Sequence, residues 1–238
     1  MLLTGRCVLS GPCDERGFVA RSTERPLVSV FGDPGVEAVR EAIEGLEGPL
    51  DLLAFDAMGP HLAAGLDDFT LERAIIHEPS DPEWYRAAAG SGRPGNAGDA
   101  RDAGVTLRPV HRAEIVARDD LEPDVKADLI EACSYSPVVA ACVGDRAISF
   151  CYASARTERW WDVSVDTLPE ARGKGLAGIA ARHLAAVMRE QGRTATWGAV
   201  ESNAASLAAA SRLGFVPTSE LWLLMREGRW PSYRREPA

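Results

Sequence analysis

The sequence is poor in several features that would assign a protein to a class at once. It has only two lysines, Lys126 and Lys174, and no apolar run as long as a membrane helix. The N-terminus lacks the basic segment and apolar run of a secretory signal. Its five cysteines include no C-x-x-C pair, which argues against a zinc site, and we expect no metal. These absences favour a reduced cytoplasmic protein without a membrane partner.

The negative charge of the chain is confined to its N-terminal part. The formal net charge is −9. Residues 1–104 contain 9 Lys+Arg against 18 Asp+Glu, whereas residues 105–238 contain 17 of each. This distribution argues against a nucleic acid as the partner. It is compatible with attraction of a cationic amine and equally with an acidic surface that keeps the protein in solution.

A stretch of small and polar residues divides the chain. Residues 90–104 have no hydrophobic periodicity and are typical of a flexible linker. Before it, residues 1–89 contain alternating and helical patterns, which predict a small α/β lobe that could shape a substrate pocket. After it, residues 105–238 predict a strand, a helix, three strands, a helix, a strand, a helix and a strand, in that order.

The most informative segment is residues 163–178, where a strand, a basic glycine turn and a helix starting near Lys174 follow one another. Backbone N–H groups and the positive end of the helix dipole converge in such a turn, which suits a phosphate or pyrophosphate. Arg172 adds further positive charge. A P-loop is excluded, because Gly173-Lys-Gly-Leu176 lacks the Ser or Thr that coordinates Mg²⁺.

A dinucleotide fingerprint is a second interpretation of the same turn. Gly173-Lys-Gly-Leu-Ala-Gly178 is a literal G-x-G-x-x-G, and Glu201 follows at about the distance of a ribose-binding acid. However, Asp166-Thr-Leu-Pro-Glu-Ala171 separates the strand from the first glycine, and too little chain follows Glu201 for a doubly wound sheet. An NAD-binding oxidoreductase is therefore the weakest of three alternatives.

Two motifs in the C-terminal half resemble those of the GNAT (GCN5-related N-acetyltransferase) superfamily. Arg172-Gly-Lys-Gly-Leu-Ala177 fits its Arg/Gln-x-x-Gly-x-Gly/Ala signature. Residues 201–215 are similar to its second hallmark, an Asn-x-x-Ala/Ser helix that closes on Leu-Gly-Phe. The resemblance covers about Val105 to Arg226. It implies an α/β (α+β) fold, with a mixed central sheet flanked by helices.

The resemblance also implies a binding site for coenzyme A. The strand of residues 160–165 would splay from the strand of residues 194–200, and the pantetheine arm would bond to the exposed backbone edge. The turn amides would hold the pyrophosphate, and Arg212 would meet a nucleotide phosphate or remain a solvated arginine at a helix end. The expected cofactor-binding residues are Val163, Val165, Arg172, Gly173, Lys174, Gly175, Leu176, Ala177, Asn203, Ser206 and Arg212.

Acyl transfer to an amine needs a proton acceptor and a route for the leaving thiolate. In enzymes similar to this sequence the base is a carboxylate on the splayed strand, and Asp162 has a suitable place, with Glu158 in reserve. An exposed strand aspartate without a catalytic role is equally compatible with position 162. Many relatives carry a tyrosine that acts as the general acid at the position where this chain has Ala210. Ser211 and Tyr152 are the remaining candidates for the general acid.

We predict a CoA-dependent N-acyltransferase that moves an acetyl group from acetyl-CoA to an amine by direct attack in a ternary complex. The acceptor would be a small molecule or a peptide, and its identity is not written in the sequence. A non-catalytic acyl-CoA-binding or regulatory module is the alternative, which Ala210 keeps open. A homodimer also stays open.

Overall fold

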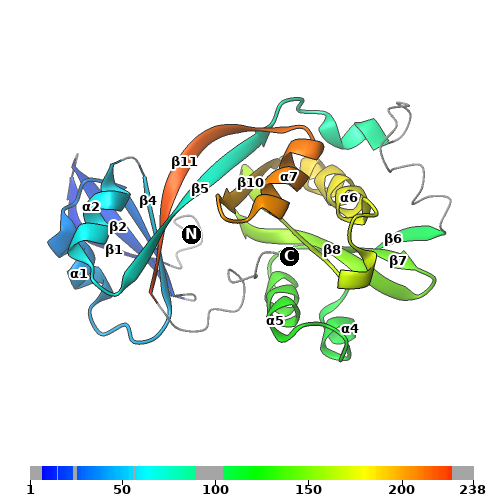
Figure 1. Cartoon of the computed structure of the whole chain (residues 1–238), viewed down its shortest axis with the longest axis horizontal. Helices are drawn as coiled ribbons and strands as arrows, with labels where there is room; N and C mark the ends of the chain where they lie inside the picture. Colours follow the sequence, from blue (N-terminus) through cyan, green and yellow to red (C-terminus); the bar gives the residue numbers. More distant parts are fainter. Residues whose placement is uncertain (1–6, 15, 24–25, 56, 89–103, 227–238) are drawn as a thin grey trace.

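The computed structural model describes residues 7–14, 16–23, 26–55, 57–88 and 104–226 (Figure 1). The predicted linker, residues 90–104, lies outside these ranges apart from Gly104. No helix within the described ranges combines the length and apolar character needed to span a membrane.

The part of the chain after the linker contains the predicted elements in the predicted order, with two additional short helices, α4 and η3. The helix of the glycine turn begins at Leu176 and not at Lys174, because Gly175 has a left-handed conformation (φ 73°) that cannot continue a helix. The elements are β6 (Val105–Val110), α4 (Arg112–Val116), α5 (Pro123–Ala132), β7 (Val138–Val143), β8 (Arg146–Arg156), β9 (Trp160–Thr167), η3 (Pro169–Ala171), α6 (Leu176–Glu190), β10 (Thr194–Val200), α7 (Ala204–Arg212) and β11 (Phe215–Arg226).

The N-terminal part is an α/β arrangement with more elements than its sequence pattern predicts. Strands β1 and β2 and helices α2 and η2 are the additional ones. The elements are β1 (Cys7–Asp14), β2 (Gly17–Ser22), β3 (Leu27–Gly32), α1 (Val36–Ile43), β4 (Leu50–Phe55), α2 (Met58–Gly65), β5 (Phe69–Pro79) and η2 (Trp84–Ala88).

All described strands form one sheet, in the order β1-β2-β3-β4-β11-β5-β10-β9-β8-β7-β6. Strand β5 lies between β11 and β10, with Ala74 opposite Leu221 on one side and Ile76 opposite Gly198 on the other. Figure 1 shows β5 and β11 as long strands that join the two ends of the molecule. The boundary predicted at residues 90–104 therefore divides the chain but does not divide the sheet.

Parallel pairing among the described strands is confined to β3–β4 and β9–β10. The other neighbours are antiparallel, so the sheet is mixed, as expected, and it is not the doubly wound sheet that a dinucleotide site requires.

Helices cover both faces of the C-terminal part of the sheet. Helix α6 buries an apolar stripe that includes Leu184 and Met188, as its 3.6-residue period predicts. Under it lie Trp161 and Trp197, each 1% exposed. The opposite face of β6–β8 packs against α4 and α5 around Leu129. Strands β9 and β10, which carry residues of the candidate site, lie between these two layers.

Candidate active site

The glycine turn between β9 and α6 has the geometry that its sequence predicts. Gly173 and Gly175 have φ angles of 76° and 73°, which glycine adopts without the steric cost of a Cβ atom. A Cβ built on Gly173 would meet no heavy atom within 4 Å, so this part of the turn faces open space. No side chain in the described part of the chain caps α6. The first amides of α6, including those of Leu176 and Ala177, therefore point toward a position suited to an anion.

The two basic residues of the turn are exposed and bonded to nearby backbone. Arg172 donates from Nε to the carbonyl oxygen of Thr167 at 3.3 Å, and Lys174 donates from Nζ to that of Glu170 at 3.0 Å. Both contacts keep positive charge beside the helix N-terminus, where it reinforces the attraction of an anion.

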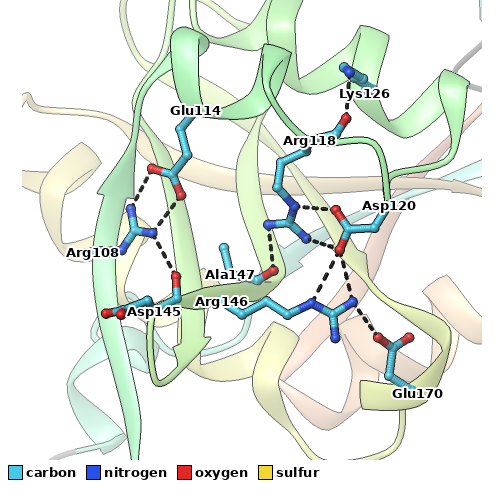
Figure 2. A network of polar contacts seen from close by, with 9 residues as sticks. All are labelled: Arg108, Glu114, Arg118, Asp120, Lys126, Asp145, Arg146, Ala147 and Glu170. Atoms are coloured by element: carbon cyan, nitrogen blue, oxygen red, sulfur yellow. Dashed lines mark hydrogen bonds and ion pairs between the residues drawn. The ribbon is translucent and has the colours of Figure 1, made fainter.

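A network of ion pairs that the sequence motifs do not reveal includes Glu170, which precedes this turn (Figure 2). Glu170 in η3 pairs with Arg146 at 2.9 Å, and Arg146 pairs with Asp120 at 3.0 Å. Hydrogen bonds from the Arg118 guanidinium, more than any other cause, hold the pKa of Asp120 below its usual range. Since Asp120 follows α4 and Arg146 begins β8, the network links the start of the glycine turn to both elements.

The second motif forms the start of α7. Asn203 caps the helix, because its Oδ1 accepts a hydrogen bond from the backbone N–H of Ser206 at 3.0 Å. The Ser206 hydroxyl accepts a hydrogen bond from Nε1 of Trp197 at 2.9 Å. Both side chains thus make bonds within the fold, and their contact with CoA stays a prediction.

The end of α7 lies against the start of α6. A Cβ on Gly178 would lie 3.1 Å from Cδ2 of Leu213, so this glycine lets the two helices approach closely. Arg212, which precedes Leu213, is exposed. Its contact with a nucleotide phosphate stays a prediction.

Strands β9 and β10 pair over only part of their length. The parallel register joins Trp160 to Thr194 and ends at Asp162 and Thr196, although both strands continue. Val163 and Val165 lie beyond this point on β9. Val163 is 3% exposed, and both side chains pack into the cluster beneath α6. Their backbone contact with a pantetheine arm remains a prediction, which side-chain burial does not oppose.

Asp162 lies where this pairing ends. Its Oδ1 accepts a hydrogen bond from the backbone N–H of Gly198 at 2.8 Å, and its Oδ2 accepts one from the Ser154 hydroxyl at 2.5 Å. Burial raises the pKa of Asp162 to about 6, while these two hydrogen bonds act in the opposite direction. A carboxylate with this pKa is ionised at neutral pH and is a stronger base than an ordinary aspartate.

The other catalytic candidates have different surroundings. Glu158 is exposed in the turn between β8 and β9. Tyr152 is buried and donates a hydrogen bond to Oδ2 of Asp166 at 2.8 Å. Ala210 is fully buried in the core, and Ser211 is exposed, about 100° around α7 from it. Ala210 therefore has no group that could donate a proton to the leaving thiolate. The side chain of Ser211 points in a different direction from that of Ala210.

The ribose-binding acid of the dinucleotide interpretation and a possible metal site concern other parts of the molecule. Glu201, the acid of the dinucleotide interpretation, forms an ion pair with Arg73 at 2.5 Å. Within the described ranges, no three His, Cys, Asp or Glu side chains lie together as a metal-binding group.

Known proteins resemble this chain in part of its sequence and in its fold. Residues 139–223 match the family model described as GNAT acetyltransferase. A comparison with curated proteins gives no match.

Solved structures match nearly the whole chain. The GCN5-related N-acetyltransferase-like protein from Streptococcus suis 89/1591 is 15% identical, with a TM-score of 0.62 over 94% of this chain and 90% of that one. The GCN5-related N-acetyltransferase from Kribbella flavida is 18% identical, with a TM-score of 0.58 over 96% and 92%. That from Sphaerobacter thermophilus is 13% identical, with a TM-score of 0.57 over 91% and 79%.

These alignments extend over the N-terminal part, which the sequence motifs do not explain. The resemblance of the C-terminal half to the GNAT superfamily is confirmed, and the chain has the fold of GNAT acetyltransferases.

Proposed function

We propose that this chain is an N-acetyltransferase that moves the acetyl group of acetyl-CoA to an amine, with Asp162 as the general base. The family match and the fold support an acyltransferase role. The observation that carries the finer proposal is the half-buried carboxylate of Asp162, whose pKa is raised to about 6, at the end of the β9–β10 pairing.

The residues of the turn fit the pyrophosphate of CoA. The open face at Gly173 leaves room for a phosphate, and the amides of the first turn of α6 supply donors. Arg172 and Lys174 supply charge. Arg212 approaches from the end of α7, and the backbone of Val163 and Val165 would pair with the pantetheine arm.

The reaction is a direct transfer in a ternary complex. Asp162 accepts a proton from the ammonium of the acceptor, and the freed nitrogen lone pair forms a bond with the thioester carbonyl carbon. The carbon–sulfur bond then breaks, CoA leaves as a thiolate, and the newly acylated nitrogen loses its second proton to solvent. A thiol with a pKa of about 8.5, as for cysteine, can depart in this form at modest cost. The buried Ala210 is compatible with such a mechanism, which uses no acid from α7.

Two measurements test the proposal. Calorimetric titration should show binding of CoA and acetyl-CoA and no binding of NAD. Release of free thiol from acetyl-CoA should then depend on the amine when a panel of small amines and peptides is added. Binding of NAD in place of CoA would contradict the proposal at its first step.

A second candidate is a non-catalytic acyl-CoA-binding module. The observation in its favour is the core position of Ala210, where relatives carry a tyrosine. Such a module would bind acetyl-CoA in the titration and release no thiol with any amine of the panel.

A further inference from the structure

We propose that a β-bulge at Ser154 positions the carboxylate of Asp162, with Ser154 and Tyr135 as its positioning residues. The proposal rests on the proposed role of Asp162 as base. It assigns these two residues no contact with the substrate, and they act only through Asp162.

The bulge follows from the register of β8 and β9. Ala153 is opposite Val163, whereas Ala155 is opposite Asp162, so β8 advances two residues where β9 advances one. Ser154 is therefore the extra residue. A bulge of this kind can re-aim a side chain. Here it brings the Ser154 hydroxyl to 2.5 Å from Oδ2 of Asp162.

Tyr135 holds the backbone of the bulge from the segment that follows α5. Its hydroxyl lies 3.0 Å from the carbonyl oxygens of both Ala153 and Ser154, and the two oxygens share its single O–H donor. A bulge locally disrupts the ladder, and a half-buried carbonyl needs a donor from elsewhere. The phenol supplies that donor and fixes the direction of Ser154.

The opposite oxygen of Asp162 is fixed from β10. Gly198 donates its N–H to Oδ1, and a Cβ at this position would lie 3.5 Å from the same oxygen and 3.4 Å from Cδ1 of Ile76. Glycine therefore leaves space beside the carboxylate. A carboxylate has about four acceptor positions, so two donors orient the group and leave capacity for a proton.

In the described part of the chain, the carboxylate of Asp162 accepts hydrogen bonds from Ser154 of β8 and Gly198 of β10, and the causes of its pKa shift include no charged group. Burial raises the pKa of Asp162, and the Ser154 hydrogen bond is the larger of the two influences that lower it. Removal of this hydroxyl should therefore raise the pKa of Asp162 further.

The test is a ¹³C NMR titration of the aspartate side-chain carboxyl carbons in the full chain without ligand. The Asp162 resonance, assigned from its loss in Asp162→Asn, should titrate near pH 6. Ser154→Ala should move it upward by about one pH unit, because a hydrogen bond to a charged group is lost. Ser154→Thr keeps a hydroxyl and should restore the original value.

Tyr135→Phe should shift the same resonance in the same direction by a smaller amount, because the donor remains but loses its support. Ser149→Ala is the matched control. Ser149 is buried on the same strand and bonds Oγ1 of Thr167 at 2.7 Å, so this variant should leave Asp162 unchanged. Folded Ser154→Ala or Tyr135→Phe proteins with an unshifted Asp162 resonance would overturn the proposal.

The activity assay separates this inference from the proposed function. With an accepted amine, the acidic limb of kcat/KM in Ser154→Ala should move upward with the NMR titration, while the KM for acetyl-CoA stays within about twofold of wild type, since Ser154 acts only through Asp162. An NMR shift without thiol release by the wild type would uphold the positioning device and reject the enzyme. Thiol release by the wild type without an NMR shift in Ser154→Ala would support the enzyme and reject the positioning device.

Discussion

Substitution of Asp162 by asparagine separates the chemistry of this residue from its structural role. Asparagine has nearly the same shape, and its Oδ1 can still accept the N–H of Gly198. Its amide can donate to the Ser154 hydroxyl, so this hydrogen bond reverses its direction and is not lost. The variant should fold and bind acetyl-CoA with an affinity within about twofold of wild type, because only the proton acceptor is removed.

The expected loss of turnover is large. Removal of a general base costs about 10²–10⁴-fold, which is about 3–5 kcal/mol of transition-state stabilisation. In the wild type the rate should rise as the pH passes about 6, since Asp162 must be ionised to accept a proton. The asparagine variant should lack this limb and keep only the titration of the amine.

The same substitution should increase stability. The folded-state pKa of Asp162 is raised from 3.8 to about 6, so the folded protein binds this proton more tightly than the unfolded chain. Stability therefore falls as the pH rises from about 4 to 6, and at pH 7 the cost of the ionised carboxylate is at most about 3 kcal/mol. Asp162→Asn should unfold at a higher urea concentration than wild type at pH 7.5, and this advantage should shrink near pH 4.

The assay is thiol release from acetyl-CoA at saturating amine between pH 5 and 9, combined with urea unfolding at the two pH values. Glu158→Gln is the matched control, because Glu158 is exposed, and it should have near-wild-type turnover. Turnover of Asp162→Asn within a few-fold of wild type would remove Asp162 from the mechanism and shift the base to Glu158 or to solvent. A variant that is both slower and less stable at pH 7.5 would indicate a structural role.

Three further predictions concern the CoA turn, each measured by calorimetric titration with CoA. Arg172→Glu combined with Lys174→Glu should weaken binding by ~1–3 kcal/mol, and an unchanged affinity would place the ligand elsewhere. Gly175→Val should weaken binding more than Lys174→Ala, since a β-branched residue resists a φ of 73°; equal affinities would reject the predicted pyrophosphate site. Arg146→Ala should weaken binding about two- to tenfold by freeing Glu170 from its exposed ion pair, and wild-type affinity would show that the network does not support the turn.

Local sequence patterns were sufficient for the parts of the site that depend on neighbouring residues. Gly173 and Gly175 predict the turn, because glycine adopts positive φ angles without steric cost and this preference does not depend on distant residues. Asn203 predicts the start of α7, because a cap bonds an amide only three positions away. The apolar stripe of α6 is predictable in the same way, because apolar residues recur along this segment of the sequence with a period of 3.6 residues.

Local sequence patterns do not predict which strands pair across the sheet. The insertion of β5 between β10 and β11 depends on contacts between residues far apart in the sequence, and no local pattern records which strands become neighbours. The bulge at Ser154 depends on the register of β8 against β9, which is fixed by the packing of both strands. The resemblance therefore indicates Asp162 by its place on the splayed strand but does not predict its two donors.

The position of β5 changes the meaning of the N-terminal part for the candidate site. The sequence pattern predicts residues 1–89 as a small α/β lobe that could shape a substrate pocket. In the fold, Ile76 of this part is the cross-strand partner of Gly198, the residue that donates to Asp162. The edge of β10 that faces away from β9 is thus completed by a strand from the other side of the linker. Because the hydrogen bonds of β5 hold β10 at that edge, the pairing of β9 with β10 can end at Asp162 and Thr196 without leaving β10 unsupported.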